Sequence, residues 1–182
     1  MLPQQELLRI AYLTICSDGK MTIDEIEKFE GIAKKVFSVT KTEIKDIKKG
    51  CDEILGEAED ETEVIDIIID EISKSLESLP KKAKPYLDFI PSFSRNIQLG
   101  KYETTEESLN YFLFLIISLS MADGEYSTEE KRIIRLIARK IEIDKSLVKE
   151  MEDTVTTLYQ IEKQRDYLNS RISSETENIA LY

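Results

Sequence analysis

A short motif that ends one helix and begins the next occurs twice in this chain, and it limits the folds that the chain can adopt. Both copies, at residues 18–25 and 123–130, have the pattern Asp-Gly-x-x-Ser/Thr-x-Asp/Glu-Glu. When residues 18–37 are aligned with residues 123–142 without a gap, six of the twenty positions are identical. An internal repeat of this kind predicts two copies of one helix-turn-helix unit, 105 residues apart in the sequence.

Most positions of the motif have a structural explanation. Thr22 with Glu25, and Ser127 with Glu130, form the pattern of a capping box. In such a box the hydroxyl accepts a hydrogen bond from the amide three residues on, and the glutamate accepts one from the amide of the capping residue. The glycine supplies the left-handed backbone that ends the preceding helix. The motif therefore predicts a helix stop followed directly by a helix start.

The structural explanation is weaker for the other acidic residues of the motif. Asp24 and Glu129 fall in the first turn of the following helix, where the helix dipole favours negative charge. Asp18 and Asp123 either bond nearby backbone, as turn residues do, or bind a ligand. Both explanations of these two aspartates are open at this point.

Apolar residues recur three or four positions apart along most of the chain, a spacing typical of amphipathic helices. With only six Gly and four Pro in 182 residues, the composition also favours helices over short strands with frequent turns. We expect helices over residues 4–17, 22–37, 42–55, 61–79, 104–122, 127–141 and 144–164. Residues 64–69 are β-branched enough to suggest a strand, but the helical spacing continues to Leu79, a length that strands rarely reach. We therefore predict an all-α fold.

Charge is distributed unevenly along the chain. The net charge of -11 would repel a phosphate backbone, so we expect no nucleic acid and no anionic membrane as a partner. Residues 52–79 hold eleven acidic residues and one basic residue, whereas residues 80–101 carry a net charge of +4. This pattern fits a solvated acidic helix face followed by a basic connector. The functional alternative is a docking surface for a basic partner.

The absence of histidine and the scarcity of cysteine restrict the chemistry. Without histidine the chain lacks the commonest general base and transition-metal ligand, and Cys16 and Cys51 are too isolated for a zinc or iron-sulfur site. A metal site must therefore use oxygen ligands, which favours calcium, magnesium or manganese. Two single cysteines and no signal peptide predict a cytoplasmic protein. The longest apolar run, residues 109–122, is too short to cross a bilayer, so we expect no direct membrane insertion.

Comparison with the calcium loop of the EF-hand gives the first functional indication. Its second half matches the motif, with an aspartate at loop position five, a glycine at six and a glutamate at twelve. The first half fails, because positions one and three are Thr14 and Cys16 in one copy and Leu119 and Met121 in the other. What remains is an aspartate and a glutamate per copy, able to hold a hard cation loosely with water. A glutamate engaged in a cap is less free to bind metal, and this weighs against such a site.

The motif is a helix that ends in Asp-Gly, then an apolar or aromatic residue, Ser/Thr, two positions and Glu, leading into an amphipathic helix. It resembles the tellurite-resistance TerB family and the related domain found beside J-domains in membrane co-chaperones. The resemblance is strongest over residues 7–37 and 112–143. It implies seven or eight helices in two pseudo-twofold halves and a cytoplasmic module of tellurite and other stress responses. It also implies metal binding by the acidic motif positions, which here are Asp18, Asp24, Glu25, Asp123, Glu129 and Glu130.

We predict one domain over residues 1–182, with half-repeats 4–79 and 104–172, a connector 80–103 and a flexible tail 173–182. Our first functional hypothesis is a module that binds a divalent cation weakly at its Asp-Gly turns and contacts a protein partner, either basic or membrane-associated. The alternative is a metal-free interaction or scaffold protein with purely structural turns. A carboxylate-metal hydrolase is least favoured, since no nucleophile elbow or phosphate-binding loop is present, and we predict no enzyme. Whether Asp18 and Asp123 lie together decides between one shared acidic site and two separate corners.

Overall fold

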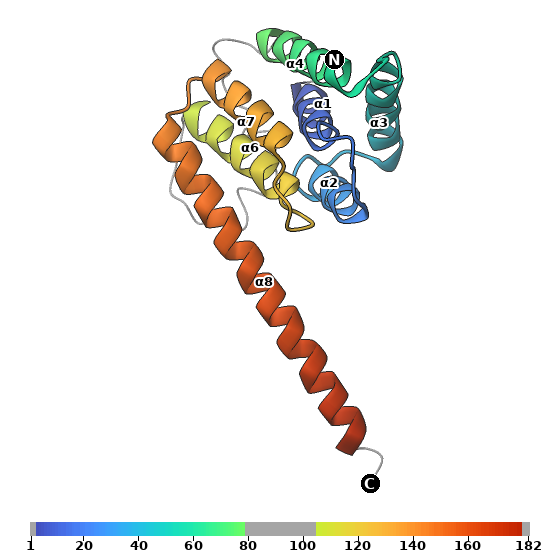
Figure 1. The fold of residues 1–182 in the computed structure, drawn as a ribbon, viewed down its shortest axis with the longest axis vertical. Coiled ribbons are helices and arrows are strands. Elements are labelled where there is room, and N and C mark those ends of the chain that lie inside the picture. The colour runs from blue at the N-terminus through green and yellow to red at the C-terminus, as the bar shows by residue number, and fades with distance from the viewer. Residues whose placement is uncertain (1–2, 79–104, 180–182) are drawn as a thin grey trace.

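The computed structural model describes residues 3–78 and 105–179, and most of these residues are helical (Figure 1). The described helices are α1 (Pro3–Ile15), α2 (Ile23–Lys35), α3 (Lys41–Leu55), α4 (Glu61–Ser78), α6 (Thr105–Ser120), α7 (Thr128–Lys140) and α8 (Lys145–Ile179). Neither described range contains a strand, which confirms the all-α prediction, including the choice of helix for residues 64–69. The predicted connector 80–103 lies outside the described residues.

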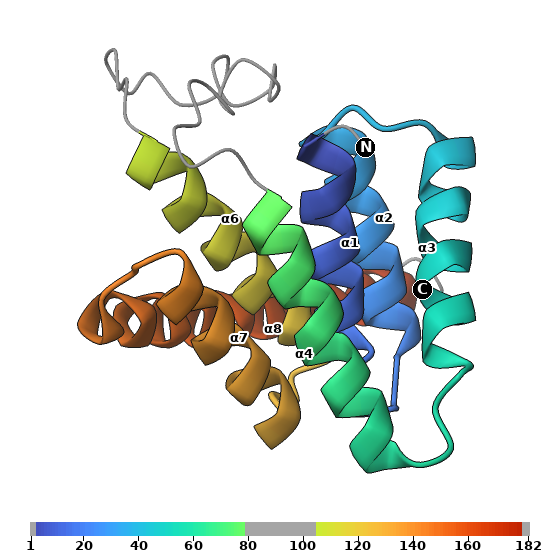
Figure 2. The same cartoon turned by 90° about the horizontal axis from the view of Figure 1, so that it is seen from above.

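Helix α1 lies at the centre of the body, in contact with α2, α3, α4, α6 and α7 (Figure 2). It occupies this place because its apolar residues cover most of its circumference, and a helix that is apolar nearly all round is stable only when buried. Helix α6 has the same character and packs against α1, α2, α7 and α8. The buried residues of these two helices include Leu8, Ile10, Leu13, Leu113, Ile116 and Ile117, all fully covered. The two helices that end in Asp-Gly thus form the core.

Each repeat has the predicted helix-turn-helix arrangement, α1 followed by α2 and α6 followed by α7. A pseudo-twofold relation between the complete halves stays a prediction. The third helix begins one residue earlier than expected, because Thr40 and Glu43 form a further capping box ahead of Lys41. The pattern Thr-x-x-Glu predicts this cap from the sequence, just as Ser/Thr-x-x-Glu does in the repeated motif.

Helix α8 differs from the other helices in length and position. Its first part packs against α6 and α7 through Val148, Met151 and Val155, and the rest extends away from the body (Figure 1). It continues as a helix to Ile179, whereas the tail was expected to begin at residue 173.

Two observations on the described residues concern membrane insertion and the reactivity of the cysteines. No helix in the ranges 3–78 and 105–179 is long and apolar enough to cross a membrane. Cys16 and Cys51 are buried and unbridged, as expected of small apolar residues. Burial raises the pKa of both thiols, that of Cys51 to about 12, so neither forms a thiolate readily at neutral pH.

Candidate functional site

The two Asp-Gly turns have the same local geometry. Asp18 Oδ1 accepts a hydrogen bond from the amide of Lys20 at 2.8 Å, and Asp123 Oδ1 accepts one from the amide of Glu125 at 2.9 Å. The glycines that follow have φ values of 69° and 90°, so both have left-handed backbone. One oxygen of each aspartate therefore serves the turn. The other has no hydrogen-bond partner among the described residues.

Both capping boxes are present as predicted. Glu25 Oε2 accepts hydrogen bonds from the amide and the hydroxyl of Thr22, at 2.7 and 2.9 Å. Glu130 Oε2 accepts the corresponding bonds from Ser127, both at 2.9 Å. The caps alone did not predict the burial of the two glutamates. Glu25 is only 4% exposed and Glu130 only 2%, whereas Glu43 in the third capping box is half-buried.

Glu130 carries a buried oxygen without a partner. Its Oε1 and the nearby hydroxyl of Ser120 are both buried, and neither forms a hydrogen bond of good geometry with the residues that the structure describes. Burial raises the pKa of the Glu130 carboxyl to about 7, although Ser127 and Ser120 act in the opposite direction. An unsatisfied carboxylate oxygen in the interior destabilises the fold, because it loses its hydration without a replacement.

The fold brings the carboxylates of both turns together. Burial raises the pKa of Glu25, and the nearby charges of Asp123 and Asp18 raise it further. The charge of Glu25 in turn raises the pKa of Glu130. We call Asp18, Glu25, Asp123 and Glu130 the acidic cluster. In the described part of the chain, no lysine or arginine forms an ion pair with any of these four carboxylates.

The other two predicted ligands, Asp24 and Glu129, are not among the main charges that raise the pKa of Glu25 or Glu130. Asp24 and Glu129 stand in the first turns of α2 and α7, where the helix dipole accounts for their charge. Asp24 is exposed and Glu129 partly so, and neither forms a hydrogen bond or ion pair with another described residue. Sequence reasoning placed all six acidic residues in one class, whereas the structure groups four of them.

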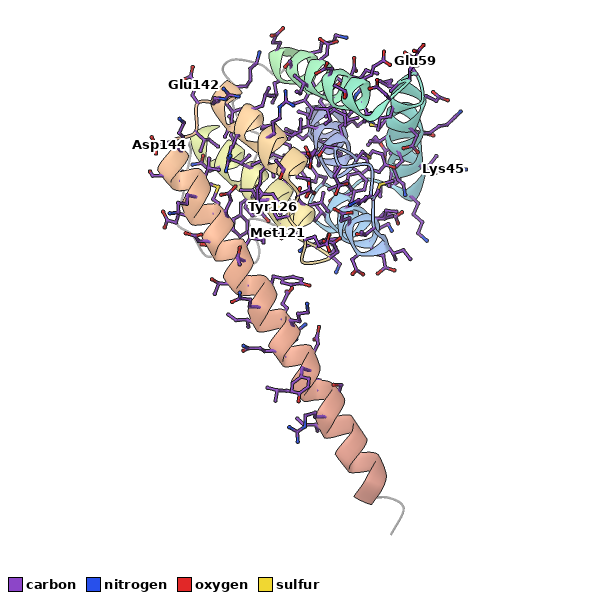
Figure 3. The ribbon with its side chains drawn as sticks, in the orientation of Figure 1. Lys45, Glu59, Met121, Tyr126, Glu142 and Asp144 are labelled. Atoms are coloured by element: carbon purple, nitrogen blue, oxygen red, sulfur yellow. The ribbon has the colours of Figure 1, made fainter. Side chains whose placement is uncertain are left out.

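The second turn is braced by α8, which the sequence did not predict. Tyr126 donates its hydroxyl proton to Glu152 at 2.9 Å, and Tyr159 donates to the backbone carbonyl of Asp123 at 3.0 Å. Figure 3 labels Tyr126 and Met121 where the loop approaches α8. Met21 occupies the position of Tyr126 in the first copy. In the sequence, the tyrosine at position 126 of the second motif was the one sign of this contact with α8.

The donor atoms suit a hard cation better than a transition metal, because carboxylate and hydroxyl oxygens are the ligands that calcium and magnesium prefer. Within the ranges 3–78 and 105–179, however, no three acidic or cysteine side chains converge closely enough to enclose an ion. The acidic cluster can therefore supply one or two direct ligands, and water would complete the coordination shell, as is common for magnesium.

The comparisons with known proteins agree with the repeated motif. The family model described as "Tellurite resistance protein TerB" matches residues 6–153. No curated protein and no solved structure matches the chain. The matched range begins in α1, includes both Asp-Gly turns and ends in the first part of α8.

Proposed function

The chain belongs to the TerB family of tellurite-resistance proteins, and we propose that it holds a divalent cation weakly at the acidic cluster of its two Asp-Gly turns. In this proposal the protein is a cytoplasmic helical module of a tellurite-type stress response, and it has no catalytic role of its own. Calcium, magnesium and manganese are the candidate ions, since the cluster offers only oxygen ligands.

One observation carries the proposal: the charges of Asp18 and Asp123 act on buried Glu25, and that of Glu25 on buried Glu130, with no lysine or arginine of the described residues ion-paired to any of the four. The charge of Asp123 reaches Glu25, and the charge of Glu25 reaches Glu130. Repulsion between the two buried carboxylates, Glu25 and Glu130, is strong because the interior screens them poorly. A bound cation would relieve this repulsion, and this favours binding.

The architecture also supports weak rather than tight binding. The second carboxylate oxygens of Asp18 and Asp123 have no hydrogen-bond partner among the described residues, whereas both glutamates are held by their caps. A cation that relies on the aspartates and on water gains little from the rest of the site. We expect dissociation constants of about 10⁻⁴ to 10⁻³ M, as in weak calcium modules.

Calorimetry tests the cation proposal directly. Titration of calcium, magnesium or manganese into the wild type is expected to release heat that an Asp18→Asn/Asp123→Asn variant does not show. Asparagine keeps an oxygen that accepts the turn hydrogen bond, so the fold should survive while the two charges are removed. Asp24→Asn/Glu129→Gln is the matched control, because it removes two charges outside the acidic cluster and should leave the heats unchanged.

Equal heats for the wild type and the Asp18→Asn/Asp123→Asn variant would contradict the cation proposal. The turns would then be purely structural, and the protein would be a metal-free interaction module. The hydrogen bonds from Lys20 and Glu125 to the two aspartates favour this second function.

The acidic face of α4 is our proposal for the surface that contacts a protein partner, basic or membrane-associated. Asp66 and Asp70 are exposed on this helix, and Lys74 is its one basic residue. We expect a lysine-rich peptide to bind the wild type and to bind an Asp66→Asn/Asp70→Asn variant about two- to thirtyfold more weakly, since each exposed charge contributes about 0.2–1 kcal/mol. Fluorescence anisotropy measures the difference, and equal affinities would exclude this face.

A further inference from the structure

The part of α8 that extends beyond the body carries an apolar stripe in solvent. Leu158 and Ile161 are 48% and 55% exposed, and Leu168 and Ile172 are 56% and 62% exposed. Figure 3 shows the side chains of this part of the helix standing clear of the other elements. The family match ends at residue 153, so the stripe lies outside it.

This stripe is not a continuation of the face that packs against the body. At 100° per residue, the direction of Val148, Met151 and Val155 continues along the helix through Glu162, Asp166 and Asn169. That face therefore becomes polar where α8 leaves the body. The apolar stripe begins at Leu158 and lies about a quarter of a turn to one side. A helix that only extended into water would be polar all round.

The spacing of the stripe is that of a coiled coil. Positions 158, 161, 165, 168 and 172 alternate in steps of three and four, which is the a and d pattern of a heptad. Continued along α8, the pattern reaches positions 175 and 179. Five of these seven positions are Leu or Ile, and the other two are Arg165 and Glu175.

We propose that residues 161–179 of α8 form an antiparallel two-helix coiled coil with the same segment of a second copy of this chain. The charges select the orientation. A parallel pair would place Arg165 opposite Arg165 and Glu175 opposite Glu175, so both polar layers would hold like charges. An antiparallel pair centred at residue 170 places Arg165 opposite Glu175 in two symmetric layers.

The same register also matches the apolar positions. It places position 168 opposite 172 and position 161 opposite 179, so each of these layers joins Leu or Ile to Ile or Leu. A shift of one heptad in either direction sets Arg165 against Leu168, or Glu175 against Ile172. Both shifts bury a charge against an apolar side chain, which is unfavourable.

The geometry leaves room for both bodies. At 1.5 Å per residue, Val155 lies about 22 Å from the centre at residue 170, so the two bodies are about 45 Å apart along the axis. Arg165 forms an ion pair with Asp166 at 3.1 Å, with both side chains well exposed. Such a pair contributes little, so Arg165 can exchange it for a partner in the second copy. The interface is short, and we expect the dimer to dissociate on dilution.

Sedimentation equilibrium of the full chain tests the proposal. From about 1 µM to about 500 µM, the range in which weak dimers dissociate, the average mass should rise from 21.0 kDa towards twice that value. Leu168→Glu should remain monomeric throughout. Its free energy of unfolding should equal that of the wild type, because Leu168 lies outside the core. A wild type that remains monomeric at the highest concentration would overturn the proposal.

Charge exchange tests the orientation. Arg165→Glu and Glu175→Arg should each weaken the dimer at least tenfold, because each sets like charges opposite each other in two layers. The double variant Arg165→Glu/Glu175→Arg should recover the wild-type dissociation constant. A dimer whose affinity is unchanged in both single variants would be parallel, and a double variant as weak as the single ones would exclude the register. Either result would overturn the proposed pairing.

Discussion

Glu130→Gln is expected to make the fold less sensitive to pH and more stable above neutral pH. Glutamine can serve the capping box, since it accepts the same hydrogen bonds from Ser127, but it places no charge in the interior. The wild type must ionise Glu130 at a position that is 2% exposed, next to the charge of Glu25. The variant avoids this unfavourable ionisation at every pH.

The direction of the effect follows from proton binding. Glu130 has a pKa of about 7 in the folded protein, against 4.5 ordinarily. Between these values the folded state holds a proton that the unfolded state has released, so stability falls as pH rises. The contribution is fully present below about pH 4.5 and is lost above about pH 7. A shift of this size corresponds to about 3–4 kcal/mol, at about 1.4 kcal/mol per pH unit.

Urea denaturation between pH 4.5 and 8.5 measures this effect. From the low to the high end, the wild type should lose about 3 kcal/mol more than Glu130→Gln. At pH 8.5 the variant should be more stable by about 1–2 kcal/mol. This gain is smaller than the full effect of avoiding ionisation, because the neutral hydrogen bonds of glutamine are weaker than those of a carboxylate. Parallel curves for the two proteins would show that Glu130 ionises without penalty, contrary to its buried, unpaired oxygen.

Glu43→Gln is the matched control, because Glu43 occupies the same position of the third capping box. Its pKa is lowered by the hydrogen bonds from Thr40. A group with a lowered pKa stabilises the fold at pH values above its pKa in the unfolded state. This stabilisation is lost as pH falls, which is the opposite of the Glu130 effect. The two substitutions should therefore change the pH dependence in opposite directions.

A cation should act on the same ionisation. Because a cation at the acidic cluster stabilises ionised Glu130, calcium or magnesium should raise the melting temperature of the wild type at pH 8 more than at pH 5. The rise should be smaller in Glu130→Gln. A rise that is equal at both pH values, or equal in both proteins, would separate cation binding from Glu130.

Local sequence patterns were sufficient for the helices and their caps. The three-and-four spacing of apolar residues identified α1, α2, α4 and α7, and the motif identified the caps at Thr22 and Ser127. These features depend on neighbours within one or two turns. One sequence therefore contains all the information they need.

Features that depend on the meeting of distant segments were not predictable in this way. The capping pattern is the same at Glu43 and Glu130, yet only Glu130 is buried, because α6 ends beside it at Ser120. The proximity of Asp123 to Glu25 likewise arises from the packing of α6 and α7 against α1 and α2. Neither spacing nor composition records such contacts.

The length of α8 was underestimated for a different reason. Its apolar stripe changes face at Leu158, beside the contact of Tyr159 with the second turn, and a search for one continuous face loses the pattern there. The helix continues because its sequence from residue 145 to residue 179 contains neither Gly nor Pro. A change in the apolar face along one helix thus indicates that its two parts pack against different partners.

The final prediction concerns the two glycines of the repeated motif, which differ in what surrounds them. A Cβ at Gly124 would lie 2.2 Å from the Tyr159 hydroxyl oxygen and 2.5 Å from Tyr159 Cζ. A Cβ at Gly19 would meet no atom within 4 Å. Both positions have a positive φ, which disfavours alanine by about 1–2 kcal/mol. We therefore expect Gly19→Ala to cost about 1–2 kcal/mol of unfolding free energy.

Gly124→Ala is expected to cost about 3–4 kcal/mol, the range reached when backbone strain and a lost contact combine. The new methyl group would displace the Tyr159 ring and break its hydrogen bond to the Asp123 carbonyl, which would loosen the contact between α8 and the second turn. Urea denaturation of both alanine variants measures the difference. Equal costs at the two positions would mean that Tyr159 moves aside freely.

A double-mutant cycle separates the steric contribution from backbone strain. In a Tyr159→Ala background the ring is absent, so Gly124→Ala should cost only the 1–2 kcal/mol of its positive φ, as Gly19→Ala does. Gly19→Ala itself should cost the same in both backgrounds. A cost for Gly124→Ala that is unchanged by Tyr159→Ala would place the strain in the turn alone. The asymmetry of the two repeats would then be independent of α8.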